Sequence, residues 1–141
     1  MKPVIQLETT GCGIASVAAI AGISYPQAKA VANSLGIRAG DKRLWSDTKY
    51  VRTLLERFDF KAHRSEIPFE SWDALPNLAL LAIKWQLERE RPFWHWVVFL
   101  RKDGSARVLD SKRSLRHHVR TDFGRMRPRW YIPVRQTFRA K

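Results

Sequence analysis

The spacing of the apolar residues changes about halfway along the chain. An almost wholly apolar stretch at Cys12–Ala21 is typical of a short buried helix, and up to Phe58 the apolar residues then recur at helical spacing. From Leu78 onward they form continuous or alternating runs rich in β-branched and aromatic residues, as is typical of strands. This pattern predicts an α+β fold in which N-terminal helices pack on a C-terminal antiparallel sheet.

Capping signals delimit the predicted helices. Ser24 and Gln27 form a capping-box pattern, and Pro26 fits the first turn of the helix that follows. Glycines after apolar stretches mark helix ends. We therefore expect helices at Cys12–Ala21 ended by Gly22, at Tyr25 to about Leu35 ended by Gly36, and at Asp47–Phe58 with Ser46 as N-cap.

The second half of the chain is predicted to form the sheet. The expected strands are Phe60–His63, Leu78–Trp85, Trp94–Leu100, Ala106–Asp110 and Trp130–Val134. A hairpin turn is predicted at Lys102-Asp103-Gly104. Pro68–Leu75 is expected to form a turn with a short helix, and Gln86–Pro92 a charged connection.

The single cysteine, Cys12, lies between Gly11 and Gly13 at the start of the first predicted helix. A helix N-terminus presents unpaired N–H groups and a partial positive charge, and both favour a thiolate. The glycines carry no side chain, so a substrate backbone can approach the sulfur. Upstream, the amide of Gln6 can help to form an oxyanion hole. Cys12 is therefore a candidate nucleophile, and the alternative is a buried structural cysteine.

A cysteine nucleophile needs a base, usually histidine, and often a third group that orients the base. Of the four histidines, His95 lies inside the strongest predicted strand, between Trp94 and Trp96, and Asp110 ends the returning strand. If the hairpin turn between these two strands has two residues, Asp110 lies diagonal to His95. If the turn has four residues, Asp110 lies directly opposite His95. Both registers place the two side chains on one face. The alternatives are a core histidine bonded to a carbonyl and a strand-end turn aspartate.

The order of these motifs resembles one known family. Gln6, then Cys12-Gly13 at a helix start, then a His-Trp-Val-Val strand and an aspartate closing the next strand is similar to the papain-like double-glycine peptidases. These are bacteriocin-processing domains, usually fused to ABC exporters, and their free-standing relatives. The resemblance runs from Gln6 to Asp110 and implies a papain-like fold.

The resemblance also implies roles for individual residues. Cys12 would be the nucleophile, His95 the general base and acid, and Asp110 the group that orients His95. Gln6 would donate to the oxyanion together with the Cys12 N–H. Cleavage of a peptide or protein substrate would follow a Gly-Gly pair, without a metal or cofactor. Trp94, Trp96 and Trp45 either form apolar subsites or belong to the core.

Two departures from the family pattern concern the substrate more than the chemistry. Gly11 stands where the family often has Asp, and Ser111 where it often has Pro. No transporter segments follow. A second hypothesis keeps the triad but changes the reaction to glutamine deamidation or acyl transfer, since the same thioester chemistry serves all three.

The charge distribution suggests a third hypothesis. The net charge is +13, and residues 111–141 contain ten Lys/Arg and one Asp, a net +9 of that total. A strongly basic surface attracts nucleic acid or acidic proteins. The chain would then be a non-enzymatic binding module whose papain-like body is a scaffold. There is no zinc-ligand spacing and no Gly-rich phosphate loop.

Length and composition suggest one folded domain over residues 1–141, with a basic C-terminal extension at about 111–141. A single cysteine excludes an internal disulfide and fits a reducing compartment. The longest apolar runs are too short to span a membrane, and no secretory-type run follows the first residues. We therefore expect a cytoplasmic protein.

Overall fold

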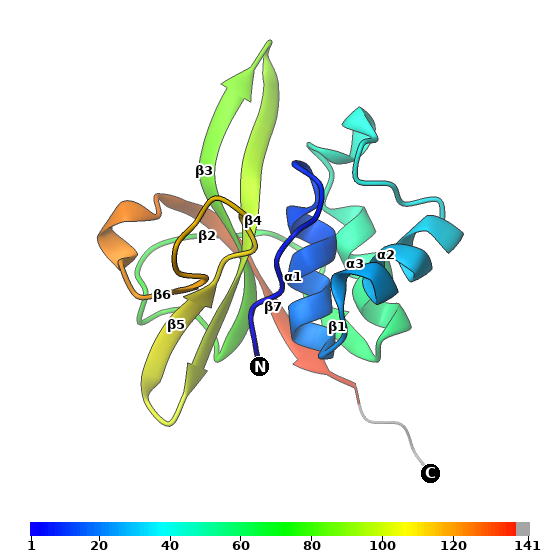
Figure 1. The fold of residues 1–141 in the computed structure, drawn as a ribbon. Helices are drawn as coiled ribbons and strands as arrows, with labels where there is room; N and C mark the ends of the chain where they lie inside the picture. Colours follow the sequence, from blue (N-terminus) through cyan, green and yellow to red (C-terminus); the bar gives the residue numbers. More distant parts are fainter. Residues whose placement is uncertain (138–141) are drawn as a thin grey trace.

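The computed structural model describes residues 1–137. Within that range, three α-helices accompany a seven-stranded antiparallel sheet with the strand order β1-β7-β3-β4-β5-β6, and β2 pairs with β7 (Figure 1). The helices are α1 (Cys12–Ala21), α2 (Tyr25–Ser34) and α3 (Lys49–Arg57). The strands are β1 (Phe60–Ala62), β2 (Ile67–Pro68), β3 (Leu78–Glu88), β4 (Arg91–Lys102), β5 (Ser105–Leu109), β6 (Val119–Arg120) and β7 (Pro128–Gln136). The predicted α+β class is confirmed.

The first two helices form as their capping signals predict. Helix α1 ends at Gly22, whose φ of 74° is left-handed. Ser24 and Gln27 make both hydrogen bonds of the capping box on α2. Helix α3 starts later than predicted, because the hydroxyl of Ser46 donates to the carbonyl of Pro92 instead of capping the helix. A contact across the fold therefore replaces the local cap.

Helix α1 is the centre of the molecule, because it contacts β4 on one side and α2 and α3 on the others (Figure 1). Its small residues Ala15, Ala18 and Ala19 are buried and let the neighbouring elements approach closely. The sheet residues that face the helices include Leu80, Trp96 and Ile132. This packing fixes the N-terminal end of α1 against β4.

The opposite face of the sheet carries a second apolar cluster, which includes Leu81, Val97 and Phe99. Residues from the loop 69–75 and from the short 3-10 helix Phe123–Arg125 with Met126 cover it. The helix expected within Pro68–Leu75 is wrong: the chain forms β2 and then turns, and Trp72 and Leu75 pack onto the sheet. Tertiary burial of these apolar side chains decides the conformation here, where local propensity does not.

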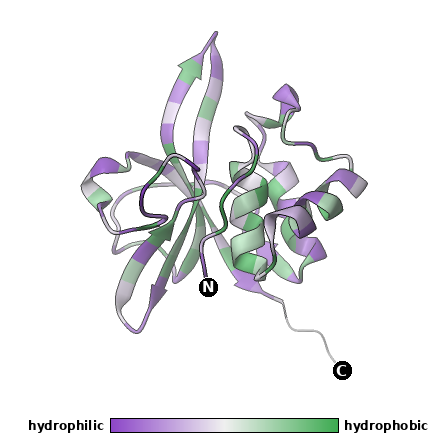
Figure 2. Cartoon of the chain, viewed as in Figure 1, coloured by the Kyte–Doolittle hydropathy of each residue, from purple (hydrophilic) through white to green (hydrophobic). Residues whose placement is uncertain are grey.

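Strands β3 and β4 extend past the rest of the sheet as a hairpin, here called the arm (residues 84–93) (Figure 1). The predicted connection Gln86–Pro92 is wrong, because only Arg89 and Glu90 form the turn, both with positive φ. Figure 2 shows hydrophilic and hydrophobic residues alternating along the arm, in contrast to the hydrophobic strands below it. Because the arm does not cover the hydrophobic core, its strands need no continuous apolar run. Their sequence therefore resembles that of a loop.

The β4–β5 hairpin has the two-residue turn. Lys102 pairs with Ser105 across Asp103 and Gly104, whose φ angles are 53° and 77°. The register continues to the pair Val98 and Leu109, and Asp110 is the residue directly after β5. The diagonal arrangement of His95 and Asp110 is therefore the correct alternative of the two.

Within residues 111–137, where a basic extension was expected, the chain contributes strands β6 and β7 to the sheet. Strand β7 pairs with β1, β2 and β3, and its residue Ile132 is fully buried. The predicted strand Trp130–Val134 is confirmed and is longer at both ends. The basic side chains of Arg129 and Arg135 point to solvent on either side of this buried stretch. Residues 138–141 of the predicted extension lie outside the described residues.

Within residues 1–137, every helix is too short or too polar to cross a lipid bilayer.

Candidate active site

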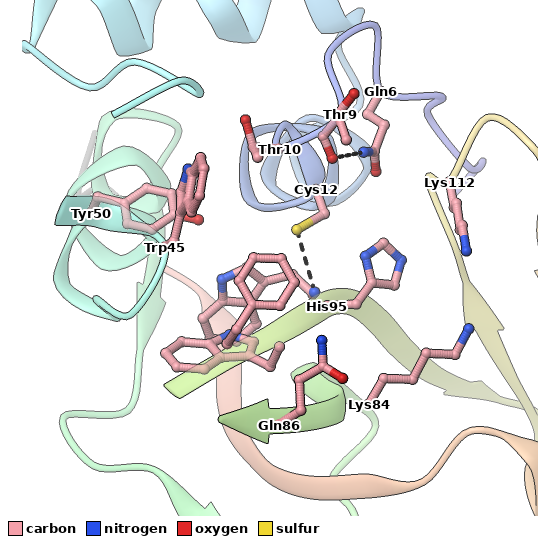
Figure 3. A pocket seen from close by; sticks show the side chains of 13 residues that line it. Gln6, Thr9, Thr10, Cys12, Trp45, Tyr50, Lys84, Gln86, His95 and Lys112 are labelled. Carbon is pink, nitrogen blue, oxygen red and sulfur yellow. Dashed lines mark hydrogen bonds between the residues drawn. The ribbon is translucent and has the colours of Figure 1, made fainter. Parts of the chain in front are cut away.

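Cys12 is the first residue of α1 and is half-buried. Its Sγ accepts a hydrogen bond from the backbone N–H of Trp96 in β4, with 3.5 Å between the two atoms (Figure 3). Gly11 is the N-cap and provides no side-chain acceptor for the first N–H groups of the helix. The sulfur therefore lies between a strand N–H and an uncapped helix N-terminus, an arrangement that favours negative charge.

His95 lies beside Cys12 on β4 (Figure 3). Its Nε2 is 2.7 Å from Oδ1 of Asp110. Since Asp110 takes Nε2, Nδ1 is the ring nitrogen that is left for the thiol of Cys12. The imidazole thus connects the sulfur to a carboxylate that is 1% exposed.

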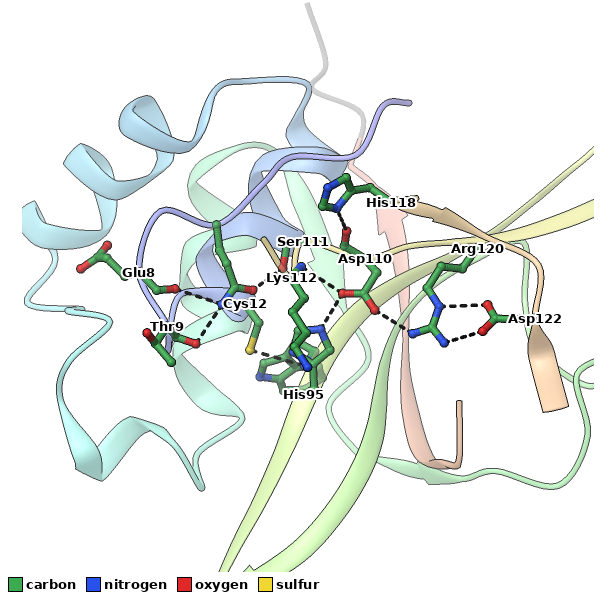
Figure 4. A network of polar contacts seen from close by, with 12 residues as sticks. Glu8, Thr9, Cys12, His95, Asp110, Ser111, Lys112, His118, Arg120 and Asp122 are labelled. Atoms are coloured by element: carbon green, nitrogen blue, oxygen red, sulfur yellow. Dashed lines mark hydrogen bonds and ion pairs between the residues drawn. The ribbon is translucent and has the colours of Figure 1, made fainter. Parts of the chain in front are cut away.

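Asp110 is held in place by four further hydrogen bonds (Figure 4). Oδ1 also accepts from the backbone N–H of Lys112, and Oδ2 accepts from Nη1 of Arg120 at 2.9 Å. Its backbone N–H donates to the carbonyl of His118, and its own carbonyl lies 2.8 Å from His118 Nδ1. A buried carboxylate with this many donors is held ionised and in one orientation.

The charges of His95 and Asp110 stabilise each other. Burial lowers the pKa of His95, but the hydrogen bonds to Asp110 and Cys12 and the charges of both groups outweigh it and raise the pKa to about 9. Burial raises the pKa of Asp110, but the hydrogen bond and charge of His95, together with Lys112 and Arg120, lower it to about 2. At neutral pH the site therefore holds a His95 imidazolium bonded to the Asp110 carboxylate.

Arg120 was not predicted as a site residue. It is 9% exposed, and its guanidinium joins Asp110 to Asp122, which accepts from both Nε and Nη2. Its sequence context is one more arginine in a basic stretch, so only the fold reveals its role. The local feature that comes closest to indicating this role is the position of Asp122 two residues after Arg120, a spacing that suits a bidentate ion pair.

Gln6 lies at the site, but its amide is already engaged. Nε2 donates to the carbonyls of Glu8 and Thr9 at 3.0 and 2.8 Å, the second of which is drawn in Figure 3, and Oε1 accepts from the hydroxyl of Ser111. Its backbone N–H donates to the Ser111 carbonyl. Gln6 therefore ties the loop before Cys12 to the residue after Asp110. As an oxyanion donor it would have to share or exchange one of these hydrogen bonds.

The two glycines beside Cys12 are tightly packed against tyrosines. A Cβ on Gly11 would lie 2.2 Å from the hydroxyl oxygen of Tyr25, and a Cβ on Gly13 would lie 2.2 Å from that of Tyr50. Both glycines are buried, and neither lines the pocket. Packing of the tyrosines on the helix start therefore requires glycine at these positions.

A pocket of about 300 Å³ opens at Cys12 and His95 (Figure 3). Trp45 and Phe93 pack edge to face at its wall, with ring centroids 6.2 Å apart. Trp94 and Trp96 line the pocket, but they are only 6% and 2% exposed, and both pack against Trp130. The two tryptophans belong to the core and form the base of the pocket.

Of the other histidines, His118 supports Asp110 through its backbone, whereas His63 is bonded elsewhere. His63 is exposed, and its ring contacts the backbone of Ser65. His118 is hydrogen-bonded to the backbone of Asp110 and was not predicted to lie near the site. Among the described residues, no cluster of His, Cys, Asp and Glu has the makeup of a metal site.

No protein-family model matches the chain, and no curated protein has a matching sequence. The function must therefore be inferred from the geometry of the site and from the resemblance of its motifs.

Proposed function

We propose that this protein is a cysteine peptidase with Cys12 as nucleophile, His95 as general acid and base, and Asp110 as the residue that orients His95. The observation that carries the proposal is the position of His95, bonded through Nε2 to a buried carboxylate and adjacent to the thiol. The helix N-terminus and the Trp96 N–H add to the stabilisation of the thiolate.

The reaction would run in two steps. The Cys12 thiolate attacks the carbonyl carbon, and the electron pair moves to the oxygen, where the Cys12 N–H is the donor at the helix start. His95 then protonates the amine as the C–N bond breaks and leaves a thioester on Cys12. Neutral His95 next takes a proton from water, the hydroxide attacks the thioester, and the thiolate is released.

Gln6 would act in one of two ways in this mechanism. By resemblance it is the second donor to the oxyanion, which requires one amide hydrogen to turn from the Glu8 or Thr9 carbonyl. In its present hydrogen bonds it is a positioning residue that holds the loop ahead of Cys12. Gln6→Ala removes both contributions, whereas Gln6→Glu keeps the acceptor for Ser111 but loses the donor.

We further propose a papain-like fold and cleavage after a Gly-Gly pair. The fold is supported by the cysteine helix packed on β4, with the histidine in β4 and the aspartate after β5. The Gly-Gly preference is carried by the motif resemblance alone. A thiolate nucleophile functions in a reducing compartment, so we propose the cytoplasm as its location.

The test is incubation of the protein with a peptide that contains a central Gly-Gly pair, followed by intact-mass analysis of the products. We expect two fragments with the wild type and none with Cys12→Ala or His95→Ala. A gain of about one dalton on a glutamine-containing peptide would instead indicate deamidation by the same thioester chemistry. An unchanged peptide in every condition, with an unreactive Cys12, would contradict the proposal.

A further inference from the structure

A second groove, of about 680 Å³, adjoins the pocket at Cys12 and shares Lys84 and Gln86 with it. It lies where the arm separates from the segment that leads into β7. Its other lining residues are Trp85, Arg125, Arg127, Pro128 and Arg129. Because the two cavities share part of their lining, a chain bound at Cys12 can continue into the groove.

The groove is strongly positive. Lys84, Arg125, Arg127 and Arg129 are exposed, and no acidic side chain of the described residues lines it. Arg129 stacks on the ring of Trp85 at 4.1 Å, which fixes the position of its charge without neutralising it.

Nearby carboxylates do not cancel this charge. Arg125 acts electrostatically on Asp122, but both oxygens of Asp122 are already bonded to Arg120. Within residues 1–137, neither Lys84 nor Arg127 takes part in an ion pair. The groove therefore presents several cations without partners to whatever enters it.

The backbone of the arm favours a polypeptide as the ligand. Pairing of β3 with β7 ends at Ile83, after which only the Lys84 N–H reaches across to the Arg127 carbonyl. Beyond Lys84, β4 is the only described strand that pairs with β3. In a two-residue hairpin the residues alternate in direction, so the N–H and C=O of Leu87 point away from β4. An open strand edge accepts an extended peptide by main-chain hydrogen bonds, which nucleic acid cannot form.

We propose that the groove binds an acidic segment of the substrate polypeptide next to the scissile bond. The segment would add as a strand to the edge of β3, with its carboxylates facing Arg125, Arg127 and Arg129. This inference rests on the proposed peptidase function, and it assigns a substrate class to that function.

Binding is tested with Cys12→Ala, which cannot turn the substrate over. The probe is a fluorescein-labelled peptide with a central Gly-Gly pair and Glu-Val repeats on both sides, compared with a peptide of the same length with Gln in place of Glu. By fluorescence anisotropy at low ionic strength, we expect the Glu peptide to bind about five-fold more tightly or better. Equal affinities for the two peptides would overturn the proposal.

The groove is tested by removing two of its charges. Arg125→Gln with Arg127→Asn is suitable, because asparagine tolerates the positive φ of residue 127. We expect this double variant to lose the preference for Glu, while the matched control Arg113→Gln with Arg116→Gln keeps it. Equal losses in both double variants would point to non-specific attraction by net charge and would contradict a dedicated groove.

Protection of Cys12 separates this inference from the peptidase proposal. In the wild type, over a time too short for cleavage of the peptide, the Glu peptide should slow alkylation of Cys12 by iodoacetamide about five-fold near saturation. Binding without protection would place the acidic segment off the substrate path and would overturn the inference, whereas the alkylation of Cys12 without peptide tests the nucleophile independently. If oligothymidylate of equal charge bound more tightly than the Glu peptide, and the groove double variant lost this binding, the ligand of the groove would be nucleic acid instead of an acidic peptide.

Discussion

The glycine before the cysteine is a packing requirement at the scale of a single residue. We expect Gly11→Ala to destabilise the fold by about 1–3 kcal/mol, since its Cβ would collide with the Tyr25 hydroxyl. Tyr25→Phe removes the nearest atom and should make the same Gly11→Ala change less costly, so the two substitutions are not additive. Urea unfolding of the two single variants and the double variant measures this coupling.

The control for this coupling is Gly40→Ala, because the space around Gly40 is open and its φ is not positive. We expect that change to be nearly neutral. If Gly11→Ala cost no more than Gly40→Ala but lowered the rate of reaction at Cys12, the glycine would serve substrate access, as the sequence alone suggested.

The charge on His95 should contribute to folding stability with a defined sign. Its pKa of about 9 lies above the usual 6.5, so the folded state holds the proton more tightly than the unfolded chain. The stabilisation is complete below about pH 6.5 and is lost as the pH rises toward 9. We expect a loss on the order of 2 kcal/mol over this interval.

Thermal and urea unfolding at several pH values measure this loss in the wild type and in His95→Gln. The variant should lose this part of the pH dependence, whereas His117→Gln, which replaces an exposed histidine, should keep it. A wild type as stable at pH 9 as at pH 6.5 would show that no such pair forms.

At the scale of single elements, the turn of the arm is unusual in its residues. Arg89 and Glu90 both adopt positive φ, which costs most side chains about 1 kcal/mol. Replacing them by Asn-Gly should stabilise the protein by about 1 kcal/mol without altering the site, as judged by urea unfolding. If this segment were a flexible charged connection instead of a hairpin, the substitution would not increase the free energy of unfolding.

The elements that sequence predicts well are those with local signals. Gly22, Ser24 and Gln27 mark helix ends through hydrogen bonds to residues nearby in the sequence. Their effect therefore does not depend on the rest of the fold. Arg89 and Glu90 carry no such signal, and Ser46 makes its hydrogen bond to the distant Pro92. Local chemistry therefore predicts helices α1 and α2 closely and misses the arm.

At the scale of the whole molecule, the basic C-terminal segment provides strand β7, which lies between β1 and β3 in the sheet. Ile132 in β7 is fully buried between β3 and the helices, so Ile132→Ala should destabilise the protein by about 2–5 kcal/mol. Arg135→Ala, which changes an exposed residue of the same strand, should have little effect on urea unfolding. Equal effects of the two substitutions would mean that β7 is a dispensable extension.

The candidate site shows how far sequence reasoning reaches across the fold. The order and spacing of Cys12, His95 and Asp110 in predicted elements sufficed to bring them together, because the hairpin register limits the choices. Arg120 and the engaged amide of Gln6 could not be foreseen. Both depend on where residues 111–120 return beside the site, and no local pattern encodes that path.

The pH dependence of Cys12 alkylation by iodoacetamide tests the central claim most directly. The extent of reaction is read by intact mass for the wild type and for His95→Ala. We predict ready alkylation below about pH 7 in the wild type and a marked loss in the variant, because imidazolium and thiolate stabilise each other. A cysteine that stays unreactive until about pH 8 or above in both proteins would be structural, and the proposed nucleophile would be wrong.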